Sequence, residues 1–258
     1  MHSTSDVLAV IPARMASTRL PGKPLLPIAG VPMLQRVYEG AAACRRFRQV
    51  VVATESPEIE SFCQAHSIPV RMTSTAHVSG TDRVWQVATE LDAAAVVNIQ
   101  GDEPMVRPEM LDALLDALFR DQATQVASLF TPISAEEAQL PSACKVVMDG
   151  RRQALYFSRA PIPFPRDAQP HYCKHLGFYA YSRAALESFH AWPASPLESV
   201  ERLEQLRFLH HGVAMAMTET PYNTIGIDTA ADVAAAEALL GGANGKHGVQ
   251  PPEGKRIR

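Results

Sequence analysis

Apolar runs of strand length alternate with amphipathic helical patterns through the first half of the chain. The runs suited to buried strands are 7–11, 50–54, 68–72 and 95–100. Helical spacing of apolar residues predicts helices over 57–65, 81–91 and 108–120, the second capped by Ser79 or Thr81. This rhythm predicts an α/β fold, Rossmann-like in type, with a mixed, mainly parallel sheet flanked by helices on both faces. Ligands of such sheets bind at the carboxyl ends of the strands.

The pattern changes after about Thr131. Strands are expected over 145–148 and 154–158 with a turn around 149–150, followed by an irregular stretch, 161–170, that holds four prolines. A strand over 176–181, a helix over 183–190, a strand over 213–218 and a closing helix over 229–240 follow. Between them, one long helix is predicted to start at Pro196, with Ser195 as its N-cap, and to stop at Gly212.

These elements predict one α/β domain over residues 1–240, with a smaller β-rich lobe at about 132–212. Residues 241–258 lack apolar periodicity and are expected to form a disordered tail.

Composition narrows the class of protein. The net charge of −3 over 258 residues argues against a nucleic-acid partner, and no apolar run approaches the length that crosses a bilayer. The N-terminus shows no secretory signal. Cys44, Cys63, Cys144 and Cys173 lack paired metal-ligand spacing and read as reduced thiols. We expect a cytoplasmic protein with no membrane partner.

A cationic loop follows the first predicted strand. Pro12 ends the strand, and Arg14, Arg19 and Lys23 follow among small residues. Guanidinium groups match phosphate oxygens bidentately and an ammonium adds a compact charge, so the loop is a candidate polyphosphate site. Its spacing matches neither the Walker pattern nor the GxGxxG fingerprint, and an ordinary solvated basic loop stays open.

Two carboxylates follow predicted strands elsewhere in the chain. In NIQGDEP an apolar strand delivers Asp102 to its carboxyl end, and in GID Asp228 precedes the last helix. Mg²⁺ takes one or two carboxylates and completes its shell with phosphates and water, so the pair is a candidate magnesium site. The alternatives are that Asp102 caps a turn, that Glu103 faces solvent, and that Asp228 or Thr229 is a helix N-cap.

Several other polar residues are weaker candidates. Gly80 and Arg83 in SGTDR enter a helix whose first N–H groups favour anions, although Arg83 could equally pair with an acidic neighbour. Arg159 could recognise a substrate carboxylate, and His175 is either a polar pocket residue or a structural histidine. Helical spacing gives a solvated face as the default interpretation of Glu201, Glu204 and Arg207.

Taken together, the motifs resemble the 3-deoxy-manno-octulosonate (Kdo) cytidylyltransferases, also called CMP-Kdo synthetases. The segments that carry the resemblance run in the family's order from about Val7 to Leu240: IPARMASTRLPGKPL, SGTDR, NIQGDEP, ALYFSRAPIP, KHLGFYAY, SPLESVERLEQLR and GIDT. Each is weak alone, and seven in register are specific.

The resemblance implies a nucleotide-diphospho-sugar transferase-like fold whose β-rich lobe serves the sugar and dimerisation. It implies the reaction of CTP with Kdo to give CMP-Kdo and pyrophosphate, with Mg²⁺ as cofactor, for lipopolysaccharide biosynthesis by a homodimer. The residues it assigns to catalysis and phosphate binding are Arg14 and Lys23, assisted by Arg19, and those it assigns to magnesium are Asp102 and Asp228. It places Ala13, Ser79 and Arg83 around the cytidine, Gln100 against nucleotide or sugar, and Arg159, His175, Glu204 and Gln205 around the sugar.

This chain departs from the family pattern in three places. VATE stands where VATD is common, IDTAAD stands where VDTPED is typical, and the loop over 165–173 is short, with Lys174 where arginine is frequent. No proposed ligand is lost. Two alternative functions stay open: a cytidylyltransferase for another acidic sugar, such as sialic acid or an amino-substituted Kdo, and a non-catalytic nucleotide-binding regulator on the same fold.

Overall fold

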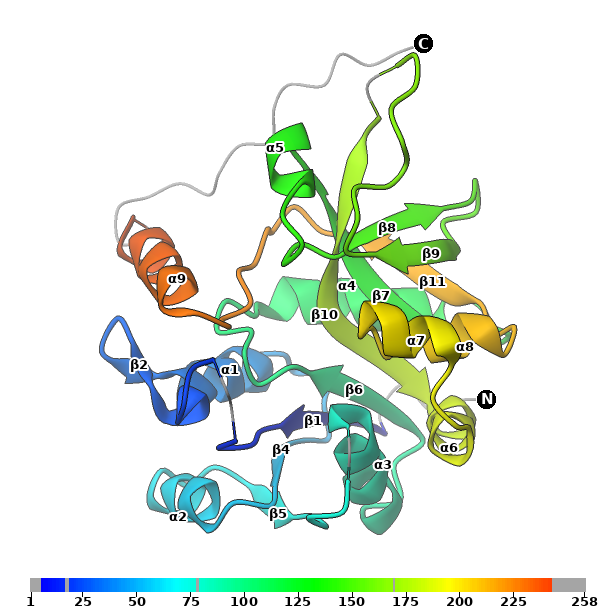
Figure 1. The fold of residues 1–258 in the computed structure, drawn as a ribbon. Helices are drawn as coiled ribbons and strands as arrows, with labels where there is room; N and C mark the ends of the chain where they lie inside the picture. Colours follow the sequence, from blue (N-terminus) through cyan, green and yellow to red (C-terminus); the bar gives the residue numbers. More distant parts are fainter. Residues whose placement is uncertain (1–5, 17–18, 78, 169, 243–258) are drawn as a thin grey trace.

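The computed structural model describes residues 6–16, 19–77, 79–168 and 170–242. A single sheet runs through the molecule in the order β11-β7-β10-β6-β1-β4-β5 (Figure 1). The strands on this path are β1 (Val7–Pro12), β4 (Gln49–Thr54), β5 (Val70–Met72), β6 (Ala95–Ile99), β7 (Val126–Ile133), β10 (Tyr172–Ser182) and β11 (Met215–Glu219). The predicted mixed, mainly parallel sheet is confirmed: β6, β1, β4 and β5 run parallel, and β10 pairs antiparallel with both β6 and β7.

The central strands are buried on both faces because helices cover each side. In β1 the odd-numbered residues Val7, Ala9 and Ile11 belong to one apolar cluster, and Leu8 and Val10 belong to the other. The first cluster packs under α1 (Met33–Ala42), α2 (Pro57–Ala65) and α4 (Pro108–Phe119). The second packs under α3 (Gly80–Glu90), α6 (Arg183–Ala191) and α8 (Leu206–His210). The alternation along the strand therefore follows the pleat of a strand with a core on each side.

The shorter elements surround this sheet. They are η1 (Lys23–Leu25), β2 (Pro27–Ile28), β3 (Val31–Pro32), α5 (Ala135–Ala138), β8 (Lys145–Met148), β9 (Ala154–Ser158), α7 (Pro196–Glu201) and α9 (Ala230–Gly242). The predicted β8–β9 hairpin is confirmed at both strands, and β8 joins the sheet by pairing with β10. Ala236 of α9 and Ile227, which precedes this helix, cluster with Ile28 and Met33, so α9 lies against β2.

The single helix predicted from Pro196 to Gly212 is wrong. Helix α7 ends at Glu201 because Arg202 takes a left-handed conformation, with φ of 54°, and α8 begins four residues later at Leu206. Glu201, Glu204 and Arg207 therefore do not share one solvated helix face, and Arg207 is buried. Periodicity missed this break because no glycine or proline marks it.

Six further elements escaped the sequence pattern: α1, β7 and the short elements η1, β2, β3 and α5. The predicted tail over 241–258 falls almost wholly outside the described residues, and its first two positions are the last of α9. The division into a domain over 1–240 and a lobe at about 132–212 stays a prediction. Among the described helices none is long and apolar enough to span a bilayer.

Candidate functional site

A pocket of about 690 Å³ opens at the carboxyl ends of β1 and β6. Ten predicted site residues line it: Ala13, Arg14, Arg19, Lys23, Ser79, Arg83, Gln100, Asp102, Glu204 and Asp228. They come from segments more than two hundred residues apart, which the parallel sheet gathers at one edge. The ends of β1 and β6 approach closely there: a Cβ on Gly101 would lie 2.8 Å from the Pro12 carbonyl oxygen.

Lys23 sits at the centre of the pocket's charges. Its Nζ lies 2.8 Å from Asp102 Oδ2 and 3.1 Å from Asp228 Oδ1, so the two carboxylates share one ammonium group. Gly22, with φ of 69°, supplies the left-handed turn that starts η1 at Lys23. Burial alone lowers the pKa of Lys23, but the two carboxylates outweigh it and raise the pKa above its ordinary value. Lys23 therefore stays charged.

The Asp228 carboxylate does not cap the following helix, because its neighbours do so. Thr229 Oγ1 accepts the Asp232 N–H at 3.3 Å, and Asp232 Oδ2 accepts the N–H groups of Asp228 and Thr229. The Asp228 carboxylate instead meets Lys23 and, at 3.0 Å, Arg19. Thr229 is thus the N-cap, and the capping interpretation of Asp228 is wrong.

The segments that carry the two aspartates are joined directly. The Ile227 N–H donates to the Asp102 carbonyl oxygen at 2.9 Å, while the Asp102 carboxylate faces Lys23. Glu103 is 8 % exposed and turns into the protein, so the alternative that it faces solvent is wrong. Burial first, and the Asp102 charge second, raise the pKa of Glu103 to about 7. Asp102 therefore points into the pocket while its neighbour points into the core.

The two aspartates fit a magnesium ion on chemical grounds. Their carboxylates converge on a cation in this structure, which is the arrangement that a hard divalent ion needs from the protein. The described residues contain no group of three or more acidic, histidine or cysteine ligands, so the rest of the shell of such an ion comes from other oxygens, such as those of substrate and water.

The wall opposite the cationic loop is built by α3. Ser79 caps the helix, its Oγ accepting the Asp82 N–H at 3.0 Å, which confirms one of the two predicted caps. Arg83 is buried and pairs with Glu55 at 2.9 Å while donating to Thr73 Oγ1 at 2.8 Å. The glutamate of VATE therefore orients an arginine of the pocket wall.

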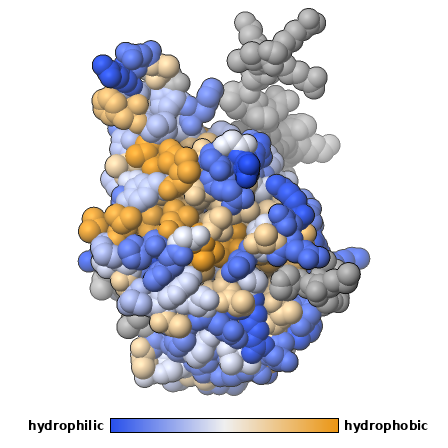
Figure 2. All heavy atoms as spheres, turned by 90° about the vertical axis from the view of Figure 1, so that its right-hand side faces the viewer, coloured by the Kyte–Doolittle hydropathy of each residue, from blue (hydrophilic) through white to orange (hydrophobic). Residues whose placement is uncertain are grey.

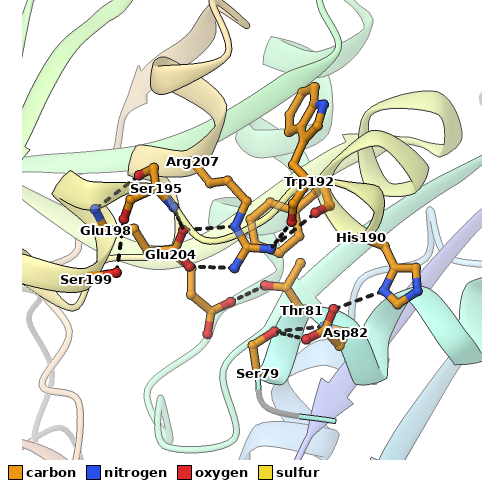
Figure 3. Close-up of polar contacts among 11 residues, drawn as sticks. Ser79, Thr81, Asp82, His190, Trp192, Ser195, Glu198, Ser199, Glu204 and Arg207 are labelled. Carbon is orange, nitrogen blue, oxygen red and sulfur yellow. Dashed lines mark hydrogen bonds and ion pairs between the residues drawn. The ribbon is translucent and has the colours of Figure 1, made fainter.

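A second cavity of about 160 Å³ adjoins the first, with Gln100 and Glu204 lining both. The break between α7 and α8 directs Glu204 and Gln205 into it. Glu204 Oε2 accepts the Thr81 hydroxyl hydrogen at 2.5 Å (Figure 3). Burial raises the pKa of Glu204, and the Thr81 hydrogen bond opposes that shift.

A buried ion pair fixes this break. Arg207 donates to Glu198 at 2.8 and 2.5 Å, and both side chains are at most 10 % exposed. The Arg207 guanidinium also lies 3.9 Å over the Phe189 ring and donates to the Trp192 carbonyl (Figure 3). Asp82 meets His190 of α6 at 3.0 Å on the same side of the site. Helices α3, α6, α7 and α8 are thus held together around the second cavity.

Two predicted sugar-binding residues line neither cavity. Arg159 is exposed and donates to the carbonyl oxygens of Glu201 and Pro141. His175 is 6 % exposed and lies behind Gln205, at 3.4 Å between Nδ1 and Gln205 Nε2. Sequence reasoning gave no site role to Thr81 and Tyr179, which line the second cavity, or to Glu55, which pairs with Arg83, although the motifs SGTDR, KHLGFYAY and VATE contain them.

Comparison with known proteins agrees with this geometry. The family profile described as "Cytidylyltransferase" matches residues 8–218. The 3-deoxy-manno-octulosonate cytidylyltransferase of Koribacter versatilis is 51% identical over 239 residues, covering 92% of this chain and 91% of that protein. The Escherichia coli protein of the same name is 45% identical over 237 residues, covering 92% and 96%.

A solved structure gives the same picture in three dimensions. It is a CMP:2-keto-3-deoxy-manno-octonic acid synthetase complexed with CTP, with a TM-score of 0.88 and 45% identity. The match covers 93% of this chain and 100% of that chain. With near-complete coverage at this identity, and with the cationic loop and both aspartates gathered at one sheet edge, the chain belongs to the cytidylyltransferase family of the 3-deoxy-manno-octulosonate cytidylyltransferases.

Proposed function

We propose that this chain is a nucleotidyltransferase that couples CTP to Kdo, giving CMP-Kdo and pyrophosphate for lipopolysaccharide synthesis. The observation that carries the proposal is the convergence of Asp102 and Asp228 on Lys23 inside a cationic pocket. A triphosphate needs cations along its length, and a divalent ion bound to it needs carboxylates opposite. Both stand at the same edge of the sheet in this chain.

The reaction is an in-line displacement at the α-phosphorus. A hydroxyl oxygen of the sugar forms the new P–O bond, the bond to the β-phosphate oxygen breaks, and the hydroxyl proton is released to water. Arg14, Arg19 and Lys23 bind the phosphates and stabilise the charge that collects on the departing pyrophosphate. Ala13, Ser79 and Arg83 are proposed around the cytidine, and Gln100 lies where the two cavities meet. Positioning and electrostatics carry the rate, and no side chain is assigned as a general base.

Mg²⁺ is the proposed cofactor, held by Asp102 and Asp228. When bound, it supplies Lewis-acid stabilisation of phosphoryl oxygens. Because Lys23 holds both carboxylates in this structure, we expect weak binding of Mg²⁺ to the protein alone and tighter binding with CTP. Calorimetric titration of Mg²⁺ into the protein, with and without a non-hydrolysable CTP analogue, measures this directly. Equal affinities in the two titrations would contradict the proposal that Lys23 competes with Mg²⁺ for the two carboxylates.

The sugar is proposed to bind in the second cavity, beside Glu204 and Gln205. Its proposed contacts with Arg159 and His175 need a different arrangement from the one described, since both lie outside the cavity lining. A cytidylyltransferase for another acidic sugar is the second candidate function, because carboxylate and amide groups such as those of Glu204 and Gln205 can hydrogen-bond hydroxyl groups of any of these sugars.

A homodimer is proposed to form through the face that Figure 2 presents, where apolar side chains gather. Leu155 of β9 is 61 % exposed, and Leu197 and Val200 of α7 are 44 % and 82 % exposed. Glu201 Oε1 accepts a hydrogen bond from Ser158 Oγ at 2.6 Å, so β9 and α7 are adjacent. Exposed apolar area of this kind marks a protein interface.

A cytoplasmic location is proposed because the four cysteines are free.

The deciding experiment measures pyrophosphate release from CTP with Kdo, sialic acid and amino-substituted Kdo, each with and without Mg²⁺. We expect release only with Mg²⁺ and fastest with Kdo. Release that is faster with sialic acid identifies the second candidate. Binding of CTP without release on any sugar identifies a non-catalytic regulator.

A further inference from the structure

Four hydrogen-bonded side chains line and back the wall of the second cavity. They come from three elements: Ser128 on β7, His175 and Tyr179 on β10, and Gln205 just before α8. Ser128, His175 and Gln205 are 0, 6 and 3 % exposed, so their hydrogen bonds cannot be exchanged for water. Each donor and acceptor can therefore be assigned in turn.

The assignment begins at Ser128. Its Oγ lies 2.7 Å from the Phe178 carbonyl oxygen and 2.8 Å from His175 Nε2. A hydroxyl carries one hydrogen, and a carbonyl can only accept, so Ser128 donates to Phe178. The Ser128 oxygen must then accept from His175, which places a hydrogen on Nε2.

The tautomer of His175 determines the orientation of the Gln205 amide. Burial lowers the pKa of His175 to about 3, so the ring is neutral and its single N–H is on Nε2. The bare Nδ1 accepts from the Gln205 amide nitrogen at 3.4 Å, and the second amide hydrogen lies toward Cys144 Sγ at 3.8 Å. Both amide hydrogens therefore point into the core.

The side-chain carbonyl oxygen of Gln205 lies on the side of the amide away from His175. Its Oε1 accepts the Tyr179 hydroxyl hydrogen at 3.2 Å, which uses one of two lone pairs. Gln205 and Tyr179 both line the second cavity, whereas His175 does not. Glu204, which lines the same cavity, adds carboxylate oxygens.

We propose that Ser128 and His175 are positioning residues that hold the Gln205 amide with its oxygen toward the second cavity, so that the cavity selects a hydroxyl donor of the substrate. This rests on the proposed function for the identity of the substrate. The hydroxyl-bearing part of the sugar then enters this cavity, and its carboxylate stays beside the cations of the first pocket, Arg14, Arg19 and Lys23.

Nitrogen-15 spectra of histidine-labelled full-length protein test the assignment. We expect His175 to give the Nε2–H tautomer signature with no titration between about pH 5 and pH 8. The signal is identified by its loss in His175→Gln. An Nδ1–H tautomer in the wild type, or a ring that titrates in this range, overturns the proposal.

The variant Ser128→Ala tests the consequence for the sugar. Loss of the Nε2–H acceptor frees the ring and the amide to turn, so the KM for Kdo should rise about tenfold while kcat and the KM for CTP change less than about twofold. Ser56→Ala is the matched control, because it removes a buried hydroxyl that caps α2. It should leave the KM for Kdo unchanged.

An unchanged KM for Kdo in Ser128→Ala overturns the proposal. A wild-type protein that releases no pyrophosphate with Kdo overturns the proposed function instead, and the tautomer spectrum still reports the hydrogen-bond chain.

Discussion

The two cavities of the candidate site differ in the charge and burial of the groups around them. In the first, charges dominate and are partly open to water: Arg19 and Asp228 side chains are 66 % and 45 % exposed, and Lys23 is 14 % exposed. The second is backed by neutral groups in the core, with His175 and Gln205 at 6 % and 3 %. Exposed charges attract a polyphosphate and are screened by salt, whereas a buried neutral network discriminates hydrogen-bond patterns. The charged pocket therefore suits affinity for a triphosphate, and the buried one suits selection of a sugar.

Removing one carboxylate of the first pocket should produce the largest effect. Asp102→Asn keeps the shape but loses the charge, so kcat should fall about a thousandfold, since several kcal/mol of charge stabilisation are lost. Pyrophosphate release at saturating Mg²⁺ measures it. Asp116→Asn, which changes an exposed aspartate paired with Arg46, is the control and should be near normal. Near-normal turnover of Asp102→Asn would remove Asp102 from the metal site.

Breaking the ion pair behind the second cavity should mainly affect stability. Arg207→Met leaves the Glu198 carboxylate buried without its partner, and the free energy of unfolding should fall by about 3–5 kcal/mol. Urea denaturation measures the loss. The double variant Glu198→Gln with Arg207→Met removes both charges and should recover part of it. A single variant as stable as the wild type would show that the pair does not hold the α7–α8 break.

The neutral, buried His175 behind the second cavity should make the stability of the folded protein depend on pH. Below pH 6.5 unfolded chains bind a proton at His175, while the folded protein binds it only near a pKa of about 3. The unfolded state then holds more protons, so stability falls as the pH drops from 6.5 toward 3, by up to about 1.4 kcal/mol per pH unit. Denaturation at several pH values should show a shallower fall for His175→Gln. Identical slopes would mean that His175 titrates normally.

The exposed cation of the first pocket should matter least. Arg19→Ala removes an ion pair to Asp228 that is open to solvent, worth about 0–1 kcal/mol. We expect the KM for CTP to rise about threefold at low ionic strength. The difference should shrink at high salt, because salt screens the exposed charge of Arg19. Steady-state kinetics at two salt concentrations measure this. A large effect that resists salt would place Arg19 in direct, desolvated contact with the phosphates.

Much of the first pocket could be predicted from the sequence because its residues follow strand ends. Arg14 and Asp102 come soon after apolar runs, and parallel strands bring such positions to one edge of the sheet. The pocket lining includes every residue predicted for the nucleotide and metal. The sequence predicted that Asp102 and Asp228 share one site, but not that Lys23 bridges them, since that contact depends on α9 packing against β2.

The second cavity was much harder to predict. Helical spacing argued for one helix from Pro196 to Gly212, but the buried pairing of Glu198 with Arg207 stabilises a broken one. That break turns Glu204 and Gln205 inward, and a default surface position becomes a cavity wall. Local pattern carries no information about a buried ion pair between two turns.

The sequence by itself determined the alternation of strands and helices and the chemistry placed at each strand end, because both follow from local apolar periodicity. Only the tertiary structure decided that Thr229 rather than Asp228 caps α9, and that His175 faces Ser128 and Gln205 and lines neither cavity. Those outcomes depend on which hydrogen-bonding groups meet after packing. A side chain's role is then set by neighbours far away in the chain.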